Sequence, residues 1–315
     1  MQDFPTAGLQ PAPGSGVPTP AATDQARPSR RPMTPVLIGV LIAVFGLLFG
    51  SIATASARNG HGSTASHGQG AGNVLSWYTG RAPTPAPTPK TDAQVPNVTL
   101  VENAIKAYYG DTVAANGDHI PSTTGNYAKQ VARIEASAEW YLAHYKAKAT
   151  DPQAKAKKAI VFDVDDTTLN TYNYEIFSNF AFNPTTNADF VNNARFPEVY
   201  GMPALAKYAS AHGYTIFFLT GRPEAQRAGT VTNLAKVGYD APDADHLYLK
   251  NNANPPAYLT CGSTCTTIQY KSGTRAHIES LGYNIVANFG DQYSDLTGGY
   301  ADRTFKMPNP MYYLP

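Results

Sequence analysis

Hydrophobic positions in the last two thirds of the chain follow two different periods. Between Tyr127 and Tyr145 they recur at spacings of three and four, which predicts an amphipathic helix with one buried face. A shorter helix is expected at Leu100–Tyr109, ended by Gly110. Further along, short apolar runs separated by helical segments predict strands. These strands are Ala159–Phe162, Thr215–Leu219, Leu247–Leu249 and Asn284–Phe289.

The segments between these runs predict how the strands are connected. Helices are expected at Met202–Ala211, Glu224–Val237 and Gly273–Leu281, with proline or glycine at several of their boundaries. Strands that alternate with helices through short connections form a parallel sheet covered on both faces. The sequence therefore predicts an α/β, Rossmann-like fold with an N-terminal helical extension. Ligands of such sheets bind at the carboxyl ends of the strands.

The first third of the chain has a different character. Residues 1–35 are rich in Pro, Gly, Ala and Thr without an apolar period, which predicts a disordered leader. Residues 36–57 carry no charge and as a helix would extend about 33 Å, enough to span a bilayer core of about 30 Å. They are also compatible with a signal peptide, because small-x-small cleavage patterns lie at 53–57. Residues 58–96 are rich in Gly, Ser and Pro and predict a linker.

Charge and cysteine content exclude several classes of protein. With 24 Lys and Arg against 23 Asp and Glu, the net charge is +1, which argues against a nucleic-acid binder with a broad basic surface. Three arginines precede the 36–57 segment and only Arg58 directly follows it, so the folded part is expected outside the cytoplasm. Two cysteines cannot build a four-thiolate metal site. In that location Cys261 and Cys265 are expected to form a local disulfide.

Paired carboxylates stand directly after the first predicted strand. Asp163 and Asp165 are two positions apart, so in extended backbone they point to the same side while Val164 turns into the core. Two carboxylates this close repel, and one stays protonated unless a cation lies between them. The pair therefore indicates a metal-binding or acid–base site. A turn or helix cap is the alternative, because Asp and Thr are also favoured at those positions.

Polar groups also follow two other predicted strands. Thr220-Gly221-Arg222 offers a hydroxyl and free backbone N–H groups to an oxyanion, although the same residues also fit an ordinary helix cap. Asp291 and Asp295 follow the last predicted strand after a glycine. Their oxygens could complete a site for a hard cation, for which magnesium is the natural occupant.

A lysine completes an ordered set of motifs. Lys271 is expected near the start of the helix before the last strand, and the alternatives are a surface lysine there or Lys250 in its role. A carboxylate pair, a threonine, a lysine and a second carboxylate pair follow one another in this order. The set resembles the haloacid dehalogenase superfamily of phosphatases, in the acid phosphatase branch of plant vegetative storage proteins and bacterial class C-like enzymes. The matching stretches are FDVDDTTLNTYNY (162–174), FLTGRPEAQRAGTVTNLAKVGY (218–239) and YKSGTRAHIESLGYNIVANFGDQYSDL (270–296).

This resemblance implies Mg²⁺-dependent hydrolysis of a small phosphorylated substrate. It implies that Asp163 is the nucleophile that forms an aspartyl-phosphate, and that Asp165 protonates the leaving alcohol and then activates water. The implied catalytic residues are Asp163, Asp165, Thr220 and Lys271; the substrate-binding residues are Thr220, Gly221, Arg222 and Lys271; and the metal ligands are Asp163, Asp165 through its carbonyl, Asp291 and Asp295.

The resemblance also implies a domain at 97–315 with a small helical cap at about 169–201. Some plant storage proteins of this branch lack the first carboxylate, whereas Asp163 is present here, which favours an active enzyme. The alternatives are a non-catalytic surface or storage-type protein that retains the fold, and phosphotransfer to an acceptor alcohol. The N-terminal helix would attach the protein to a membrane if it is not cleaved.

Overall fold

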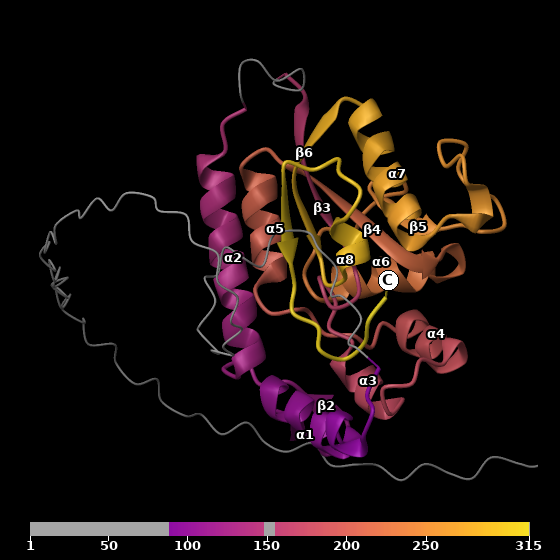
Figure 1. Cartoon of the computed structure of the whole chain (residues 1–315). Helices are drawn as coiled ribbons and strands as arrows, with labels where there is room; N and C mark the ends of the chain where they lie inside the picture. The colour runs from indigo at the N-terminus through magenta and orange to yellow at the C-terminus, as the bar shows by residue number, and fades with distance from the viewer. Residues whose placement is uncertain (1–87, 148–154, 315) are drawn as a thin grey trace, which may run out of the picture. The chain divides into compact units, whose positions relative to one another are not determined.

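The computed structural model describes residues 88–147 and 155–314 (Figure 1). The predicted leader at 1–35, the apolar segment at 36–57 and most of the linker at 58–96 lie outside these residues. Within the described ranges, no helix combines the length and the apolar character that a membrane span requires.

A five-stranded parallel sheet forms the centre of the described domain (Figure 1). Its strand order is β5-β4-β3-β6-β7, and each neighbouring pair is parallel. Four of the strands contain the predicted runs, and the edge strand β7 was not predicted. The strands are β3 (Lys157–Phe162), β4 (Thr215–Pro223), β5 (Leu247–Lys250), β6 (Tyr283–Gly290) and β7 (Arg303–Lys306).

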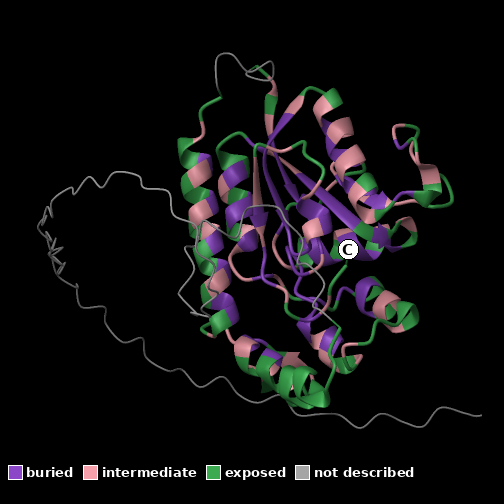
Figure 2. Cartoon of the chain, viewed as in Figure 1, coloured by how far each residue is buried: buried purple, intermediate pink, exposed green. Residues whose placement is uncertain are grey.

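Helices cover both faces of this sheet. Along β3, Ile160 and Phe162 join a hydrophobic cluster with side chains of α2 and α5, whereas Ala159 and Val161 join a second cluster with side chains of α7. Figure 2 shows the strands buried between these layers. The predicted fold class, with its N-terminal helical extension, is therefore confirmed. The helices of these layers and of the extension are α1 (Val98–Tyr109), α2 (Asn126–His144), α5 (Met202–Ala211), α6 (Arg227–Lys236) and α7 (Thr267–Ser280).

Some element boundaries differ from the prediction. Helix α7 begins at Thr267 and not at Gly273, because Thr266 and Gln269 form a capping box in which each side chain accepts from the other residue's backbone N–H. Strand β4 continues through Thr220 to Pro223, so the helix cap that was the alternative for these residues is the end of a strand. A two-stranded hairpin, β1 (Thr112–Val113) and β2 (His119–Ile120), was also not predicted.

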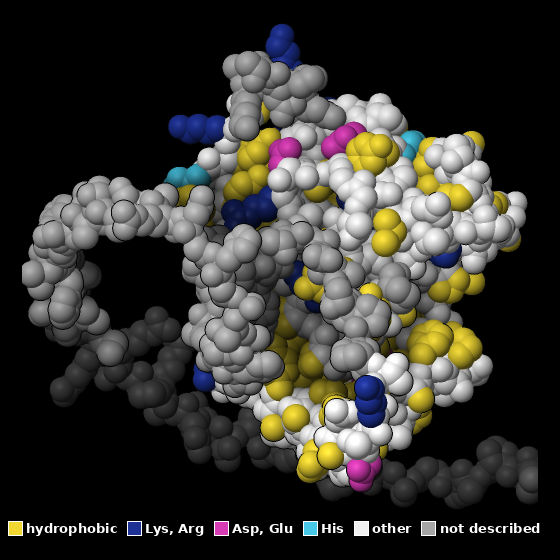
Figure 3. Space-filling model, in the orientation of Figure 1, with side chains coloured by type: hydrophobic (Ala, Val, Ile, Leu, Met, Phe, Trp, Pro, Cys, Tyr) yellow, Lys and Arg dark blue, Asp and Glu magenta, His cyan; other side chains and the backbone are white. Residues whose placement is uncertain are grey.

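Short elements surround the carboxyl end of the sheet. Helices α3 (Tyr172–Phe177) and α4 (Pro184–Asn192) fall within the predicted cap range. Helix α8 (Tyr293–Leu296) follows β6. On the face shown in Figure 3, charged side chains are scattered among other types, as a charged content of 15% leads one to expect.

Candidate active site

The ends of β3 and β6 are joined where the predicted motifs begin. The backbone N–H of Asp163 donates to the carbonyl of Phe289 (2.9 Å). This hydrogen bond fixes the end of β3 beside the end of β6, which is followed by Asp291. Two motifs that are far apart in the sequence therefore meet at one edge of the sheet.

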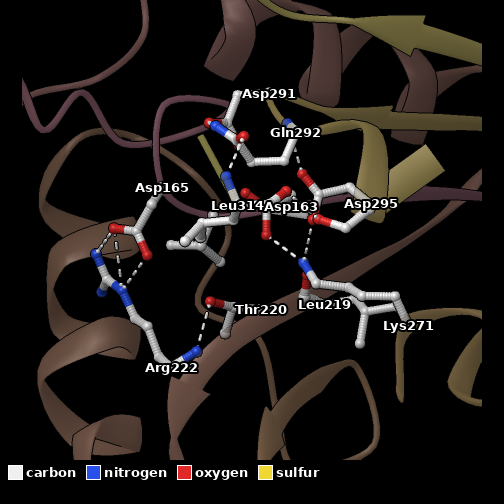
Figure 4. Close-up of polar contacts among 12 residues, drawn as sticks. Asp163, Asp165, Leu219, Thr220, Arg222, Lys271, Asp291, Gln292, Asp295 and Leu314 are labelled. Carbon is white, nitrogen blue, oxygen red and sulfur yellow. Dashed lines mark hydrogen bonds and ion pairs between the residues drawn. The ribbon is translucent and has the colours of Figure 1, made fainter. Parts of the chain in front are cut away.

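Three buried carboxylates meet at this edge (Figure 4). Asp163, Asp291 and Asp295 each offer one oxygen, and these oxygens all lie within 4.8 Å of one another. Carboxylate oxygens are the donors that Mg²⁺ prefers in proteins. The donor set therefore fits a divalent hard cation.

Lys271 places a positive charge against the same cluster (Figure 4). Its Nζ donates to Asp163, lies 3.1 Å from Oδ1 of Asp295 and donates to the carbonyl of Leu219 (2.6 Å). Three ionised carboxylates and one ammonium leave a net charge of −2, which one divalent cation neutralises. Lys250, the alternative to Lys271 in the sequence analysis, instead donates to the carbonyl of Cys265 (3.3 Å).

The backbone at Gly290 and Gln292 lies close to the side chain of Asp295. The backbone N–H of Gln292 donates to Oδ2 of Asp295 (2.9 Å). A Cβ on Gly290 would lie 2.4 Å from the Cβ of Asp295, so only glycine fits there.

Arg275, which the sequence analysis did not single out, is fully buried and holds the loop after β6 in place. Its guanidinium donates to the carbonyls of Asp295, Thr297 and Gly299 at 2.6–2.9 Å.

Asp291 is held by amide side chains that the sequence analysis also missed. Nε2 of Gln292 and Nδ2 of Asn309 each donate to its Oδ2 at 2.7 Å. Gln292 is the neighbour of Asp291, whereas Asn309 comes from the segment after β7. No pattern in that Pro- and Asn-containing segment indicates such a contact.

Burial without a metal ion disfavours the charged form of these acids. Burial raises the pKa of Asp163 well above its usual range, and the charges of Asp295 and Asp291 add to this effect against the opposing influence of Lys271. Burial and the charge of Asp295 raise the pKa of Asp291 to about 8. Burial alone would lower the pKa of Lys271, but the attraction of Asp163 and Asp295 outweighs it and the pKa is raised.

Asp165 lies apart from this cluster and forms an ion pair with Arg222 (Figure 4). Nη2 of Arg222 donates to Oδ1 of Asp165 (2.6 Å) and Nε donates to Oδ2 (3.0 Å), while Nη1 donates to Thr230 (3.0 Å). The side chain of Asp165 is 28% exposed, and that of Arg222 is 3% exposed. The arginine is therefore a fixed support, and the carboxylate faces the accessible side of the site.

Thr220 and Gly221 occupy the end of β4 beside this pair. The hydroxyl oxygen of buried Thr220 accepts from the backbone N–H of Arg222 (3.1 Å), which leaves the hydroxyl proton free to donate. A Cβ on Gly221 would meet no atom within 4 Å, so its backbone borders open space. This edge can offer donors to an oxyanion.

Asp166 lies behind the site and is fully buried. It accepts from the hydroxyls of Thr171 (2.5 Å) and Tyr312 (2.9 Å). Burial raises its pKa to about 7, against the effect of these hydrogen bonds. Asp166 therefore connects the loop after β3 to helix α3 and to the segment after β7.

Cys261 and Cys265 lie in the insertion between β5 and α7. Their Cα atoms are 5.0 Å apart, which is disulfide distance. The bond itself stays a prediction.

Comparisons with known proteins identify relatives of this chain. The chain is 35% identical over 174 residues to the stem 28 kDa glycoprotein of Glycine max, spanning 53% of this chain and 64% of that protein, a little under two thirds. It is 33% identical over 197 residues to acid phosphatase 1 of Solanum lycopersicum, spanning 60% of this chain and 69% of that protein.

Solved structures and a family model complete the comparison. The class C acid phosphatase from Bacillus anthracis shares the fold, with a TM-score of 0.51, 22% identity, and coverage of 68% of this chain and 86% of that one. A model of the haloacid dehalogenase superfamily, subfamily IIIB (acid phosphatase), matches residues 93–315. The chain therefore belongs to subfamily IIIB of the haloacid dehalogenase superfamily, the acid phosphatases.

Proposed function

We propose that this protein hydrolyses small phosphomonoesters in a Mg²⁺-dependent reaction that passes through an aspartyl-phosphate on Asp163. The observation that carries the proposal is the meeting of Asp163, Asp291 and Asp295 with Lys271. Asp163 and Lys271 are 108 positions apart in the sequence, yet they are in direct contact in a buried site. A buried cluster of like charges is unfavourable on its own, so a role in binding and catalysis accounts for it.

Asp163 would attack the phosphorus atom, and the leaving alcohol would depart on the opposite side. Lys271 and the hydroxyl of Thr220 would hold phosphoryl oxygens, so that charge developing on them is stabilised by donors already in place. Asp163, Asp291 and the Asp165 carbonyl would hold Mg²⁺, with Asp295 in support, and the ion would supply the positive charge that lets a carboxylate approach a phosphate.

Asp165 would act as the acid and then as the base. It would give a proton to the leaving oxygen and later take one from the water that hydrolyses the aspartyl-phosphate. Its bidentate pairing with Arg222 holds the carboxylate in one orientation. We predicted that Arg222 contacts substrate; its donors to Asp165 and Thr230 favour a positioning role, and the substrate contact stays a prediction.

The proposed location is outside the cytoplasm. The excess of arginines before residues 36–57 supports it, as does the similarity to plant proteins named as stem glycoproteins. Whether residues 36–57 anchor the chain or are cleaved is tested by the mass of the mature N-terminus.

The activity is tested with p-nitrophenyl phosphate as substrate. We expect Mg²⁺-dependent release of phosphate that EDTA abolishes and that added Mg²⁺ restores. Asp163→Asn should lose at least about a thousandfold in kcat, because it removes the nucleophile. Asp240→Asn, an exposed change of the same kind, is the matched control and should keep full turnover.

A defined set of results would refute the proposal. Full turnover by Asp163→Asn would show that Asp163 is not the nucleophile. A folded protein that hydrolyses no member of a panel of phosphate esters with Mg²⁺ present would instead support the storage-type alternative, which the presence of Asp163 does not favour.

A further inference from the structure

The two oxygens of the Asp291 carboxylate lie in different surroundings. Oδ2 accepts two hydrogen bonds, one from Nε2 of Gln292 and one from Nδ2 of Asn309, each at 2.7 Å. Within the residues that the structure describes, no hydrogen bond is made to Oδ1. Each oxygen of an ionised carboxylate has two lone pairs, so Oδ2 is fully used. Oδ1 is therefore the oxygen that remains for a ligand.

The segment after β7 fixes the orientation of both amides. Oε1 of Gln292 accepts from the backbone N–H of Leu314 at 2.9 Å (Figure 4). Oδ1 of Asn309 accepts from the backbone N–H of Met311 at 2.8 Å. A backbone N–H can only donate, so the amide atom that faces it must be the oxygen. The amide nitrogen of each side chain must then face Asp291.

The other two acids of the cluster are also engaged. Oδ1 of Asp163 accepts from Lys271. Asp295 has a contact on each oxygen, because its Oδ1 lies 3.1 Å from Nζ of Lys271 and its Oδ2 accepts from the backbone N–H of Gln292 (2.9 Å). As far as the described residues go, none of the three acids therefore presents two free oxygens to a cation.

Mg²⁺ and Ca²⁺ differ in what they require from an acid. Mg²⁺ is small and demands a near-ideal octahedron, to which a carboxylate contributes one oxygen. Ca²⁺ is larger, takes more ligands and readily binds both oxygens of one carboxylate. An acid that is limited to one free oxygen therefore favours Mg²⁺.

We propose that Gln292 and Asn309 are positioning residues that leave Asp291 one oxygen for a metal ion and thereby set a preference for Mg²⁺ over Ca²⁺. This inference rests on the metal site of the proposed function and explains how that site selects its ion. The two amides act only through Oδ2 of Asp291. Without them, Asp291 is free to turn and to offer both oxygens.

The test is calorimetric titration of the full chain with MgCl₂ and with CaCl₂ at one pH. Asn309→Leu keeps the size of the side chain but removes the donor, so the affinity for Mg²⁺ should fall about tenfold. The affinity for Ca²⁺ should fall less, because the freed Oδ2 becomes a further ligand atom. The ratio of the Kd for Ca²⁺ to the Kd for Mg²⁺ should therefore fall at least about fivefold. Competition from a proton on Asp291 is the same for both metals and cancels in this ratio.

A second variant and a control accompany this measurement. Gln292→Met also removes an amide donor and should lower the ratio in the same direction, and it provides the test if Asn309→Leu does not fold. Asn103→Leu makes the same chemical change at an exposed position of α1. This matched control should leave both Kd values unchanged.

Titration without substrate separates this inference from the proposed function. A lowered ratio in a protein that hydrolyses no phosphate ester would support the positioning role and refute the phosphatase function. A ratio that stays within about twofold of the wild type in both variants would refute the positioning role, whether or not esters are hydrolysed, because general loosening weakens both metals alike. A wild-type protein that binds Ca²⁺ as tightly as Mg²⁺ would overturn it as well.

Discussion

The two halves of the candidate site differ in their charge. The phosphoryl half consists of Asp163, Asp291, Asp295 and Lys271, and the leaving-group half consists of Asp165 and Arg222. In the phosphoryl half, Lys271 lies against two of three carboxylates and also donates to a backbone carbonyl. In the leaving-group half, Arg222 is committed through two nitrogens to the carboxylate of Asp165. One fixed cation therefore serves three acids in the first half and one acid in the second.

The difference indicates what each half binds. A deficit of two charges in the phosphoryl half fits a divalent metal ion with its oxygen ligands, whereas the acid of the leaving-group half already has its own fixed cation. Burial makes the deficit of the phosphoryl half important, because charges are poorly screened away from water. The four predictions that follow change the charge or the protonation of one group at a time.

Removing the lysine should have the largest effect. Lys271→Gln leaves the buried carboxylates of the phosphoryl half without their fixed cation, so kcat/KM for p-nitrophenyl phosphate should fall about a thousandfold. Without metal the variant should also unfold at a lower temperature, and Mg²⁺ should restore part of that loss. Exposed Lys129→Gln is the control for both measurements. Retention of more than a tenth of the activity would contradict the phosphoryl contact.

The affinity of the phosphoryl half for Mg²⁺ should depend strongly on pH. The pKa of Asp291 is raised from 3.8 to about 8, so the stability linked to its protonated form is complete below about pH 4 and is lost as the pH rises through about 8. Binding of Mg²⁺ displaces that proton, so the apparent affinity should rise about tenfold per pH unit well below pH 8, or about fiftyfold from pH 6 to pH 8.

Calorimetry in buffers of different ionisation enthalpy measures both the affinity and the protons released. Asp291→Asn is the comparison variant, and it should lose this pH dependence together with most of the affinity. An affinity that is constant between pH 6 and pH 8 would show that Asp291 is already ionised before the metal binds.

Changing the arginine should separate the two halves. Arg222→Lys keeps the charge but cannot reproduce the bidentate pairing with Asp165, so kcat should fall about tenfold to thirtyfold. Affinity for Mg²⁺ should stay within about twofold of the wild type, because the phosphoryl half is untouched. A parallel loss of Mg²⁺ affinity would mean that the halves do not act independently.

The last prediction concerns stability and not activity. Glu175 lies on α3, and burial raises its pKa from 4.5 to about 7, so its contribution to stability is lost as the pH rises through about 7. Glu175→Gln should therefore stabilise the metal-free protein at pH 8 by up to about 3 kcal/mol and leave it unchanged at pH 4. Urea unfolding at the two pH values measures this difference, and an equal gain at pH 4 would rule out the electrostatic cause.

The sequence predicted the parallel sheet because its strands are apolar runs bounded by Gly, Pro or charged residues. It also indicated Asp163, Asp291, Asp295 and Lys271, because these residues stand at strand ends or near a helix start, where topology alone brings groups together. The early start of α7 had a local signal, Thr266 followed three residues later by Gln269, that the sequence analysis overlooked.

Other features could not be predicted from local pattern. Strand β7 has only four residues, with one buried phenylalanine between polar neighbours, so its period is too short to recognise. The pairing of Arg222 with Asp165 and the burial of Glu175 depend on which side chains the folded chain brings together. Both depend on tertiary contacts, which produce no periodic pattern in the sequence.

The segment after β7 determines when the site is completed during synthesis. Asn309 binds Asp291, and the hydroxyl of Tyr312 reaches Asp166 from 146 positions further along the chain. A ribosome therefore makes every residue of the sheet before it makes the side chains that hold these two acids in place. Until residues 309–312 have emerged, the nascent polypeptide has the proposed nucleophile Asp163 but lacks the contacts that support Asp291, the proposed metal ligand, so the site is completed only after the sheet.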